Sequence, residues 1–295
     1  MSWLEAVVLG IVQGITEFLP ISSTAHLRIA PELIGWQDPG AAFSAVIQLG
    51  TVAAVIIYFG KDLVRLTAAF FESIAHRSPF ESTESRLAWF VVIGTIPVAV
   101  AGVLFKKNIE TSLRSLYVIA ISMIALALVL FAVEKLASHR KTLQQMTLGD
   151  GIVIGLCQAL ALIPGSSRSG TTLTGALAVG LKREDAARYS FLLSIPATTA
   201  AGIFELRHFV RASDHPTAGP LILGTVVSFG AGMLAIAGLL RFLRTHSTGV
   251  FVVYRVLVGS ILLVLLGVGV LRPSSGSGAE AERTASLARQ QPVAD

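Results

Sequence analysis

Six apolar runs in this chain of 295 residues are each long enough to cross the roughly 30 Å of bilayer hydrocarbon as an α-helix. Because backbone N–H and C=O groups find no water in lipid, such runs restrict the chain to helices that satisfy their own hydrogen bonds. Hydrophobic residues make up 53% of the chain and charged residues 14%, which excludes an ordinary soluble domain. The sequence therefore predicts an all-α polytopic membrane protein. The expected transmembrane helices are 43–60, 88–105, 115–136, 187–206, 219–241 and 249–271.

Two further segments, 3–34 and 150–180, are apolar at both ends but carry a polar break near the middle. The first break is the string FLPISSTAH at 18–26, and the second is LIPGSSRSG at 162–170. Each break predicts two half-length helices joined by a turn, which is tolerated at membrane depth only inside protein or beside a wet cavity. We therefore expect two re-entrant helical hairpins. Polar groups are costly at that depth, so the two turns are also the first place to look for function.

The two halves of the chain resemble each other. The Pro-x-Ser-Ser cores begin at Pro20 and Pro164, an offset of 144, and similar helical stretches begin at Ser44 and Ser190, an offset of 146. Each half is expected to contain one re-entrant hairpin and three transmembrane helices. An odd number of crossings inverts the second copy, so the hairpins should enter from opposite faces and meet near the midplane.

We expect a single membrane domain over 1–271, made of repeats at about 1–136 and 148–271. Residues 272–295 are rich in Ser, Gly, Ala and charge without apolar periodicity, which predicts a disordered tail.

Basic residues in the connectors predict the orientation. One side of this topology collects 12 Lys and Arg residues and the other collects 5, so the richer side should be cytoplasmic. Both termini and the first hairpin then face outward, and the second hairpin enters from the cytoplasm. Because these charges are spread over short connectors, the net charge of +5 does not indicate nucleic-acid binding. The richer side holds Lys61, Arg65, Arg77, Arg86, Lys135, Arg140, Lys141, Lys182, Arg183, Arg188, Arg241 and Arg244; the other holds Lys106, Lys107, Arg114, Arg207 and Arg211.

The first hairpin gathers parts for nucleophilic or acid-base catalysis. Gln13 and Glu17 are four apart and share one helix face, and Ser23 and His26 share a face of the following half-helix. A hydroxyl, an imidazole and a carboxylate at one turn suit phosphoryl or acyl transfer. The alternative is that Ser22 and Ser23 only cap a helix and that His26 is a buried structural histidine. The combination with a carboxylate at membrane depth favours catalysis.

The second hairpin predicts an anion site. A turn of Gly and Ser leads into a helix, so backbone N–H groups and the hydroxyls of Ser167, Ser169 and Thr172 are expected around Arg168. A guanidinium donates two parallel hydrogen bonds to phosphate, which suits this site better than an ammonium would. The alternative is that Arg168 pairs with a buried carboxylate such as Glu17.

Three other charged residues occur in or beside apolar runs. Arg255 lies inside an apolar run and must find a partner or water, so a structural pair is favoured over catalysis, while Glu134 and Glu205 lie at the ends of transmembrane runs and are expected to be interfacial. No nucleotide-binding loop, HExxH or paired-Cys motif occurs. Glu17 with Gln13 offers too few ligands for an all-protein metal cage, but a hard cation shared with substrate phosphates fits.

At these residues the chain resembles the undecaprenyl pyrophosphate phosphatase family, also called the bacitracin-resistance protein family. Its first motif is met by Gln13, Glu17, Phe18, Leu19, Pro20, Ser22, Ser23, Thr24 and His26. Its second motif is met by Pro164, Gly165, Ser167, Arg168, Ser169, Gly170 and Thr172. The resemblance covers about residues 1–271. One departure is Gln13, because many members carry Glu there, which argues against a strictly two-carboxylate mechanism.

The resemblance implies an undecaprenyl-diphosphatase of the bacterial inner membrane that hydrolyses the lipid diphosphate to the monophosphate carrier of peptidoglycan synthesis and confers bacitracin resistance. It implies a divalent cation, Mg²⁺ or Ca²⁺, held by Glu17 and Gln13, with Arg168, Ser167, Ser169 and Thr172 on the phosphate oxygens. Ser23 is expected to attack with His26 as base, and a phosphohistidine route through His26 stays open. The expected partners are the polyprenyl diphosphate and membrane lipids, with no nucleic acid; a homodimer is left open.

Two rival functions follow from the same features. Inverted repeats with broken helices at the midplane are also a transporter design, so a lipid transporter or flippase is the leading alternative. The type-2 phosphatidic acid phosphatases have superficially similar Ser-Gly-His and Ser-Arg elements, but their basic first motif and downstream histidine are missing here. Release of phosphate from a prenyl diphosphate by the purified protein separates an enzyme from a transporter.

Overall fold

The computed structural model describes residues 1–36, 40–110, 113, 115–211 and 218–271. These residues form α-helices and two short 3₁₀ helices, with no strand among them. The predicted disordered tail at 272–295 lies outside the described residues. The helices are α1 (Trp3–Phe18), α2 (Ser23–Ile34), α3 (Gly40–Tyr58), α4 (Gly60–Ala75), α5 (Thr83–Leu104), α6 (Lys106–Glu110), α7 (Leu116–Leu136), η2 (Leu143–Gln145), α8 (Leu148–Ala159), η3 (Leu160–Leu162), α9 (Arg168–Ala178), α10 (Arg183–Arg211), α11 (Ala218–Leu243) and α12 (Gly249–Gly267).

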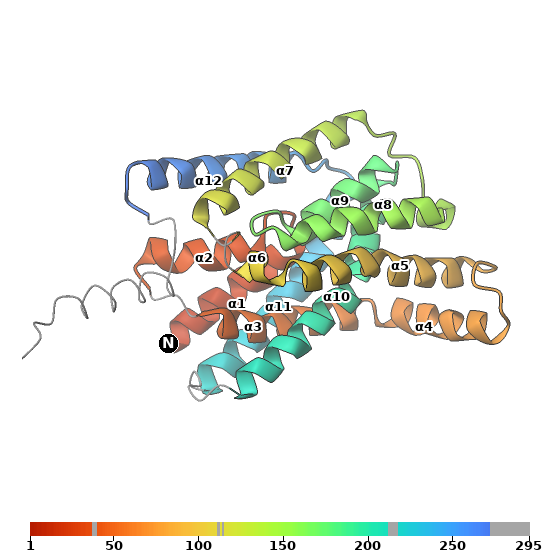
Figure 1. Ribbon diagram of the computed structural model, residues 1–295, viewed down its shortest axis with the longest axis horizontal. Helices are drawn as coiled ribbons and strands as arrows, with labels where there is room; N and C mark the ends of the chain where they lie inside the picture. Colours follow the sequence, from red (N-terminus) through yellow and green to blue (C-terminus); the bar gives the residue numbers. More distant parts are fainter. Residues whose placement is uncertain (37–39, 111–112, 114, 212–217, 272–295) are drawn as a thin grey trace, which may run out of the picture.

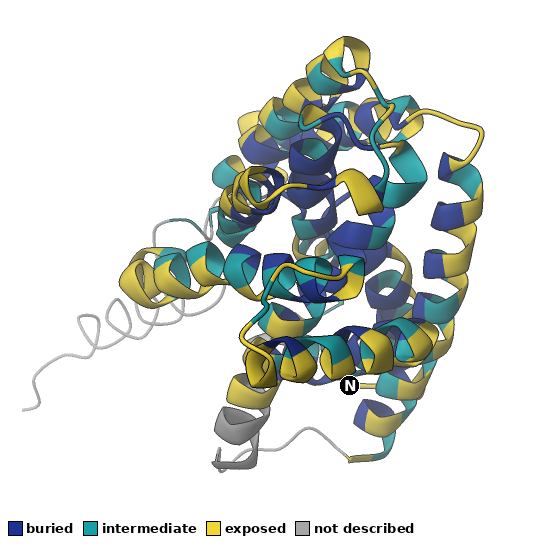
Figure 2. Cartoon of the chain, turned by 90° about the vertical axis from the view of Figure 1, so that its right-hand side faces the viewer, coloured by how far each residue is buried: buried dark blue, intermediate teal, exposed yellow. Residues whose placement is uncertain are grey.

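The protein is an all-α polytopic membrane protein. In the described part of the chain, α5, α7, α11 and α12 are each long and apolar enough to cross a bilayer, and the bent pair α3–α4 adds a fifth candidate. Large apolar side chains face outward, with Val103, Leu136 and Leu234 each more than three-quarters exposed. Figure 2 shows this pattern as exposed outer faces around a buried interior. Such a surface suits lipid and would be unusual for a soluble monomer.

The helix α4 was not predicted. The apolar run at 43–60 forms α3, but the chain then turns by 75° at Phe59 and continues as a second helix. Polar and charged residues occupy one face of α4, so it has no continuous apolar run from which a transmembrane helix is predicted. Its apolar face packs against α5, where Trp89 Nε1 donates to Ser73 Oγ at 3.0 Å. The predicted helix at 187–206 lies within α10; that α3 and α10 cross the bilayer stays a prediction.

Each of the two interrupted segments forms two half-length helices joined by a turn, as predicted, and the two turns share one backbone conformation; that the hairpins are re-entrant stays a prediction. The second helix of each hairpin begins after a serine with a left-handed backbone: Ser22 with φ of 77° before α2, and Ser167 with φ of 67° before α9. Each serine caps its helix, since Ser22 Oγ accepts from Ala25 N and Ser167 Oγ accepts from Gly170 N. The aligned Pro-x-Ser-Ser cores, which are 144 residues apart, pair Ser22 with Ser166. The capping serines are 145 residues apart, so in the structure Ser22 corresponds to Ser167.

Helix packing repeats with the same spacing. Gly10 of α1 lies against α11, where an added Cβ would come within 2.5 Å of Gly224 O. Gly155 of α8, again 145 residues later, lies against α5, where a Cβ would come within 2.6 Å of Gly94. Small residues let membrane helices approach this closely. In Figure 1 the hairpin α1–α2 reaches the middle of the molecule from the left and α8–α9 from the right, so the two turns meet. Opposite entry into a bilayer stays a prediction.

The ends of the helices near the connector 137–147 are tied by ion pairs. Glu134 is buried and binds Arg183 Nη2 at 2.6 Å and Thr248 Oγ1 at 2.9 Å, so it joins α7, α10 and the start of α12. Lys141 Nζ lies 2.8 Å from Asp150 Oδ2 at the start of α8. Burial raises the pKa of the Asp150 carboxyl. Hydrogen bonds from Lys141 and Thr147 lower this pKa by more than burial raises it, so it lies below its ordinary value. Glu134 is thus a buried structural carboxylate, and its predicted place at the membrane interface stays a prediction; the side chain of Glu205 lies outside the described residues.

Candidate active site

Glu17 is the centre of a network that joins the two hairpins. Its Oε2 accepts from Ser23 Oγ at 2.7 Å and from Gln13 Nε2 at 3.2 Å, and its Oε1 accepts from Arg168 Nη2 at 3.1 Å. The carboxylate is only 8% exposed, so it must be paired to stay charged. The helical spacing of Gln13 and Glu17, and the turn that returns Ser23 to them, place all three on one side of the first hairpin. The two turns thus meet, and the pair of Arg168 with Glu17 that the sequence analysis left open as the alternative is present.

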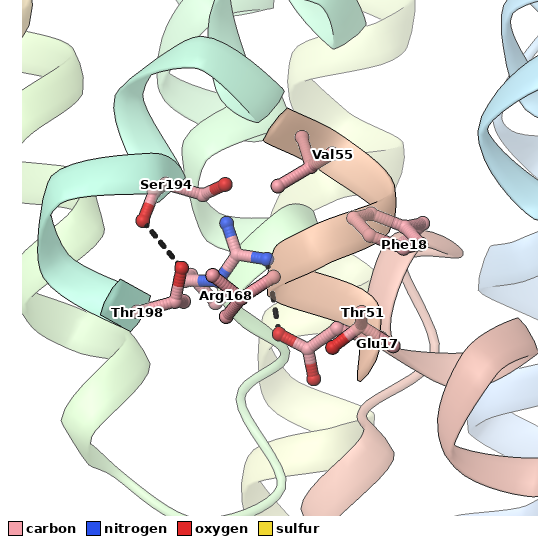
Figure 3. A pocket seen from close by; sticks show the side chains of 8 residues that line it. Glu17, Phe18, Thr51, Val55, Arg168, Ser194 and Thr198 are labelled. Atoms are coloured by element: carbon pink, nitrogen blue, oxygen red, sulfur yellow. Dashed lines mark hydrogen bonds and ion pairs between the residues drawn. The ribbon is translucent and has the colours of Figure 1, made fainter. Parts of the chain in front are cut away.

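Arg168 keeps two donors free. Its Nη2 binds Glu17, but its Nε and Nη1 are buried and have no hydrogen-bond partner in the described part of the chain. Figure 3 shows this guanidinium in a narrow pocket with Glu17 and Thr51 on one side and Ser194 and Thr198 on the other. A buried cation with unused donors costs free energy, which a bound anion would recover.

The hydroxyls of the second turn tie the hairpin tips together. Ser169 Oγ donates to the carbonyl of Leu19 at 2.9 Å, across the boundary between the hairpins. Ser167 Oγ lies 3.1 Å from Ser169 Oγ and also caps α9. Both serines are buried next to Arg168, where they would meet an anion at this helix start.

The hydroxyl of Thr172 is already bound by other groups of the protein. Its Oγ1 donates to the Arg168 carbonyl at 2.8 Å and also contacts Ser190 Oγ of α10. The side chain is fully buried. In this arrangement Thr172 holds α9 against α10 and so fixes the backbone beneath Arg168; direct contact of Thr172 with phosphate stays a prediction.

His26 has different partners from those predicted. Its Nδ1 lies 2.7 Å from the carbonyl of Ser22, and its Nε2 lies 2.7 Å from Tyr254 Oη. A carbonyl only accepts, so Nδ1 carries the proton and Nε2 of the neutral ring accepts from Tyr254. The rings of His26 and Tyr254 also stack, with 5.6 Å between centroids. Ser23 meanwhile donates to Glu17, so the carboxylate is the base nearest the serine here.

Sequence analysis did not find Tyr254, nor the contacts that hold the second turn. Arg255 is fully buried and donates from Nη2 to the carbonyls of Gly165 and Ser166, at 3.2 and 2.8 Å. Ser122 Oγ of α7 donates to Pro164 O at 2.6 Å. Gly165 has φ of +89°, and a Cβ there would lie 2.3 Å from Ser122 Oγ, so only glycine fits. Arg255 therefore holds the second turn through backbone carbonyls and not through the expected ion pair, and its Nε and Nη1 have no hydrogen-bond partner among the described residues.

Comparison with known proteins identifies the family. Residues 6–261 match the sequence profile of the family described as "Bacitracin resistance protein BacA". The chain belongs to this family. It is 68% identical over 276 residues to a protein of Myxococcus xanthus named undecaprenyl-diphosphatase, over 94% of this chain and 93% of the relative. Proteins of the same name from Chloroherpeton thalassium and Chlorobaculum tepidum are 52% and 50% identical, over 92% of this chain and 99% and 100% of their own lengths. The resemblance of the two motifs to the bacitracin-resistance family is confirmed.

A divalent cation fits this family member only together with other oxygen ligands. No group of three or more His, Cys, Asp or Glu side chains that could hold a metal ion occurs among the described residues. Glu17 and Gln13 supply one carboxylate and one amide oxygen, whereas Mg²⁺ and Ca²⁺ take about six or more oxygens. A diphosphate and water would have to supply the rest.

Proposed function

We propose that this protein is an undecaprenyl-diphosphatase that removes the terminal phosphate of undecaprenyl diphosphate and so regenerates the monophosphate carrier used in peptidoglycan synthesis. One observation carries the proposal: the turns of the two hairpins join Glu17, Ser23 and Arg168 in a single buried network at positions that match the family motifs. Relatives up to 68% identical bear the name of this activity. Loss of the carrier's diphosphate form would account for bacitracin resistance.

Substrate binding follows from the free donors. The prenyl chain stays in lipid while the diphosphate enters between the hairpin turns, where Nε and Nη1 of Arg168 bind its oxygens. Ser167 and Ser169 add hydroxyls, and the start of α9 adds backbone N–H groups. These fixed donors stabilise the charge that develops on the phosphoryl oxygens as the bond to the leaving phosphate breaks.

Chemistry starts from the hydrogen bond between Ser23 and Glu17. Ser23 Oγ passes its proton to a base and attacks the terminal phosphorus, and the prenyl phosphate leaves with the bridging oxygen. Glu17 already accepts a hydrogen bond from Ser23 at 2.7 Å, so Glu17 is a second candidate for this base in addition to His26, the base expected from the sequence. Water then cleaves the phosphoserine and releases phosphate. In the alternative route, His26 leaves Tyr254 and attacks through Nε2.

The cation, location and orientation belong to the same proposal. Glu17 and Gln13 would hold a Mg²⁺ or Ca²⁺ ion together with the diphosphate, and the ion would neutralise phosphate charge when bound. The protein would lie in the bacterial inner membrane with its active site opening to the periplasmic face. The connector charges support this orientation.

The activity is tested by phosphate release from farnesyl or undecaprenyl diphosphate by purified protein with Mg²⁺ or Ca²⁺. Arg168→Ala should reduce kcat/KM by about 10²–10³-fold, because fixed donors to a transition state contribute that much. Arg168→Lys should recover part of the loss in KM but little in kcat, since a lysine lacks the planar fork. The matched control is Arg140→Ala, an exposed arginine in the connector 137–147. Wild-type activity in Arg168→Ala would contradict the site.

The attacking group is tested by trapping with labelled substrate. A phosphoserine adduct survives acid and is lost in base, whereas phosphohistidine is lost in acid. We expect an acid-stable adduct that disappears in Ser23→Ala. An acid-labile adduct that persists in Ser23→Ala would assign the attack to His26.

A further inference from the structure

A second cavity, of about 1000 Å³ and open to the surroundings, lies away from the hairpin turns. The elbow between α3 and α4, the first turns of α10 and the last turns of α11 form its walls. Ligand sites in proteins typically enclose about 300–1000 Å³, so this cavity has room for a molecule larger than an ion.

The polar side chains that line this cavity carry a net positive charge. Five Lys or Arg side chains line it against two carboxylates, which leaves three positive charges without a compensating carboxylate. The cations are Lys61, Arg65, Arg188, Arg241 and Arg244, and the carboxylates are Asp62 and Glu184. Basic pockets between membrane helices are the usual sites for anionic lipid head groups.

The ion pairs in the cavity leave defined donors available. Asp62 binds both Arg65 and Arg188, so one carboxylate is shared by two guanidinium groups. Arg244 Nη2 lies 2.8 Å from Glu184 Oε1. Lys61 and Arg241 are exposed, and neither forms an ion pair with a described residue. Two unpaired cations on α4 and α11 therefore face the same space as the shared arginines.

Apolar side chains line the same cavity beside the cations. Ile57 and Tyr58 of α3 line the cavity with 59% and 38% of their surface exposed, and Ala237 and Leu240 of α11 line it as well. A free phosphate ion would gain nothing from contact with these apolar side chains. A lipid can place its head group on the cations and its acyl chains on the apolar side chains.

Aromatic rings separate this cavity from the candidate active site. Phe59 of the elbow packs on Phe191 with 6.1 Å between ring centroids, and Phe191 packs edge-on against Phe18 at 5.4 Å. Phe18 is the neighbour of Glu17, and all three rings are buried. The cavity and the Glu17–Arg168 pocket thus share α3 and α10 without being one pocket.

We propose that this cavity binds an anionic phospholipid by its phosphate head group, with Lys61 and Arg241 as the principal free cations. The proposal does not rest on the phosphatase activity, because none of the residues of the hairpin turns takes part. All five cations belong to the 12 that connector counting places on one side of the membrane, so the lipid would come from that leaflet.

The test is a binding titration of the full-length protein in an uncharged detergent with a fluorescent phosphatidylglycerol. Lys61→Gln/Arg241→Gln should raise the Kd about tenfold or more, because each cation near an anionic lipid contributes on the order of 1 kcal/mol. The matched control Arg140→Gln/Lys182→Gln removes the same charge from exposed connector residues outside the cavity and should leave the Kd unchanged. Phosphatidylcholine with the same chains should bind at least about tenfold more weakly.

Three results would overturn the proposal. An equal loss of affinity in the two double variants would mean that the whole charged surface, and not the cavity, attracts the lipid. Loss of phosphatidylglycerol binding in Arg168→Ala would place the lipid in the hairpin site instead. Competition by an excess of inorganic phosphate that matches competition by unlabelled phosphatidylglycerol would assign the cavity to free phosphate. Prenyl diphosphate hydrolysis in each variant, measured in parallel, keeps this outcome separate from that of the proposed activity.

Discussion

Glu17 illustrates how single side chains decide the chemistry of this site. It accepts from three donors, and one of them is Gln13, where many members of the family carry glutamate. An amide donates one of its N–H groups to Glu17 and adds no charge. A second carboxylate at that position would instead repel the first unless a cation lay between them.

We expect Gln13→Glu to make the protein more dependent on divalent cations. With chelator present, two carboxylates separated by about the present 3.2 Å contact should lower the Tm. With Mg²⁺ or Ca²⁺ added, the Tm should recover, and the cation concentration for half-maximal activity should fall about tenfold because a charged ligand has been gained. The control is Gln13→Ala, which removes the amide without adding charge. An unchanged cation dependence in Gln13→Glu would exclude Gln13 from the cation site.

The sequence predicted the charged centre of the site but not its surroundings. Glu17, Ser23 and Arg168 lie in two local motifs, and the similarity of the halves indicated that the motifs meet. Tyr254 comes from a distant helix without any motif, so its contact with His26 depends on how α12 packs against the rest of the protein. The direction of a hydroxyl such as that of Thr172 depends on its neighbour Ser190 in α10, which spacing within the motif does not reveal.

At the scale of elements, each hairpin turn depends on a serine in the left-handed region. For Ser22, we expect alanine to be worse than glycine: Ala loses the cap at about 1 kcal/mol and keeps the left-handed strain of roughly 1–2 kcal/mol that Ser22 itself already carries, whereas Gly relieves that strain. Glycine adopts this backbone freely and should cost only a few tenths of a kcal/mol as a cap. Unfolding titrations in detergent would measure both variants.

Ser82 gives the matched control for this comparison. It caps α5 in the same way, but its φ is −93°, so no residue is strained there. The difference between the Ala and Gly variants should therefore be larger at Ser22 than at Ser82. Equal differences at the two positions would argue that the backbone of Ser22 is not left-handed in the protein.

Close helix packing at glycine predicts that Gly→Ala destabilises the protein at one position and stabilises it at another. Gly14→Ala in α1 would place a Cβ within 2.6 Å of Ser228 O in α11, so the helices must separate, and we expect a loss of about 1–3 kcal/mol. Gly230→Ala in α11 meets no atom within 4 Å and should stabilise its helix by up to about 1 kcal/mol. A Tm for Gly14→Ala at or above that of Gly230→Ala would contradict the close packing of α1 on α11.

At the same scale, the limits of hydropathy are plain in α4. Apolar runs located the six long helices and the two interrupted ones, because length and composition are properties of each segment alone. The bend of 75° at Phe59 is not. The bend depends on the packing of Phe59 on Phe191, which no local pattern encodes, whereas the polar face of α4 is a local pattern that a search for apolar runs alone does not detect.

At the scale of the whole molecule, the candidate active site and the cationic cavity are built on the same two helices, α3 and α10. The hairpin turns meet around Glu17 and Arg168, and the cationic cavity lies beyond the rings of Phe18, Phe191 and Phe59 on the same helices α3 and α10. The distribution of connector charges predicts an orientation of the protein in the membrane. That orientation would decide from which leaflet each proposed site takes its lipid.

Labelling of single cysteines measures that orientation. With the native thiol removed by Cys157→Ser, Asn108→Cys lies in α6 on the side predicted to face outward, and Gln144→Cys lies in the connector 137–147 on the basic side. Both positions are exposed, so a difference in reaction reports sidedness and not burial. An impermeant maleimide should label Asn108→Cys in right-side-out vesicles and Gln144→Cys only in inverted or permeabilised ones. The reverse pattern would mean that the orientation is the opposite of the predicted one. The hairpin α1–α2 and both termini would then face the cytoplasm, and the cationic cavity would face the outer leaflet.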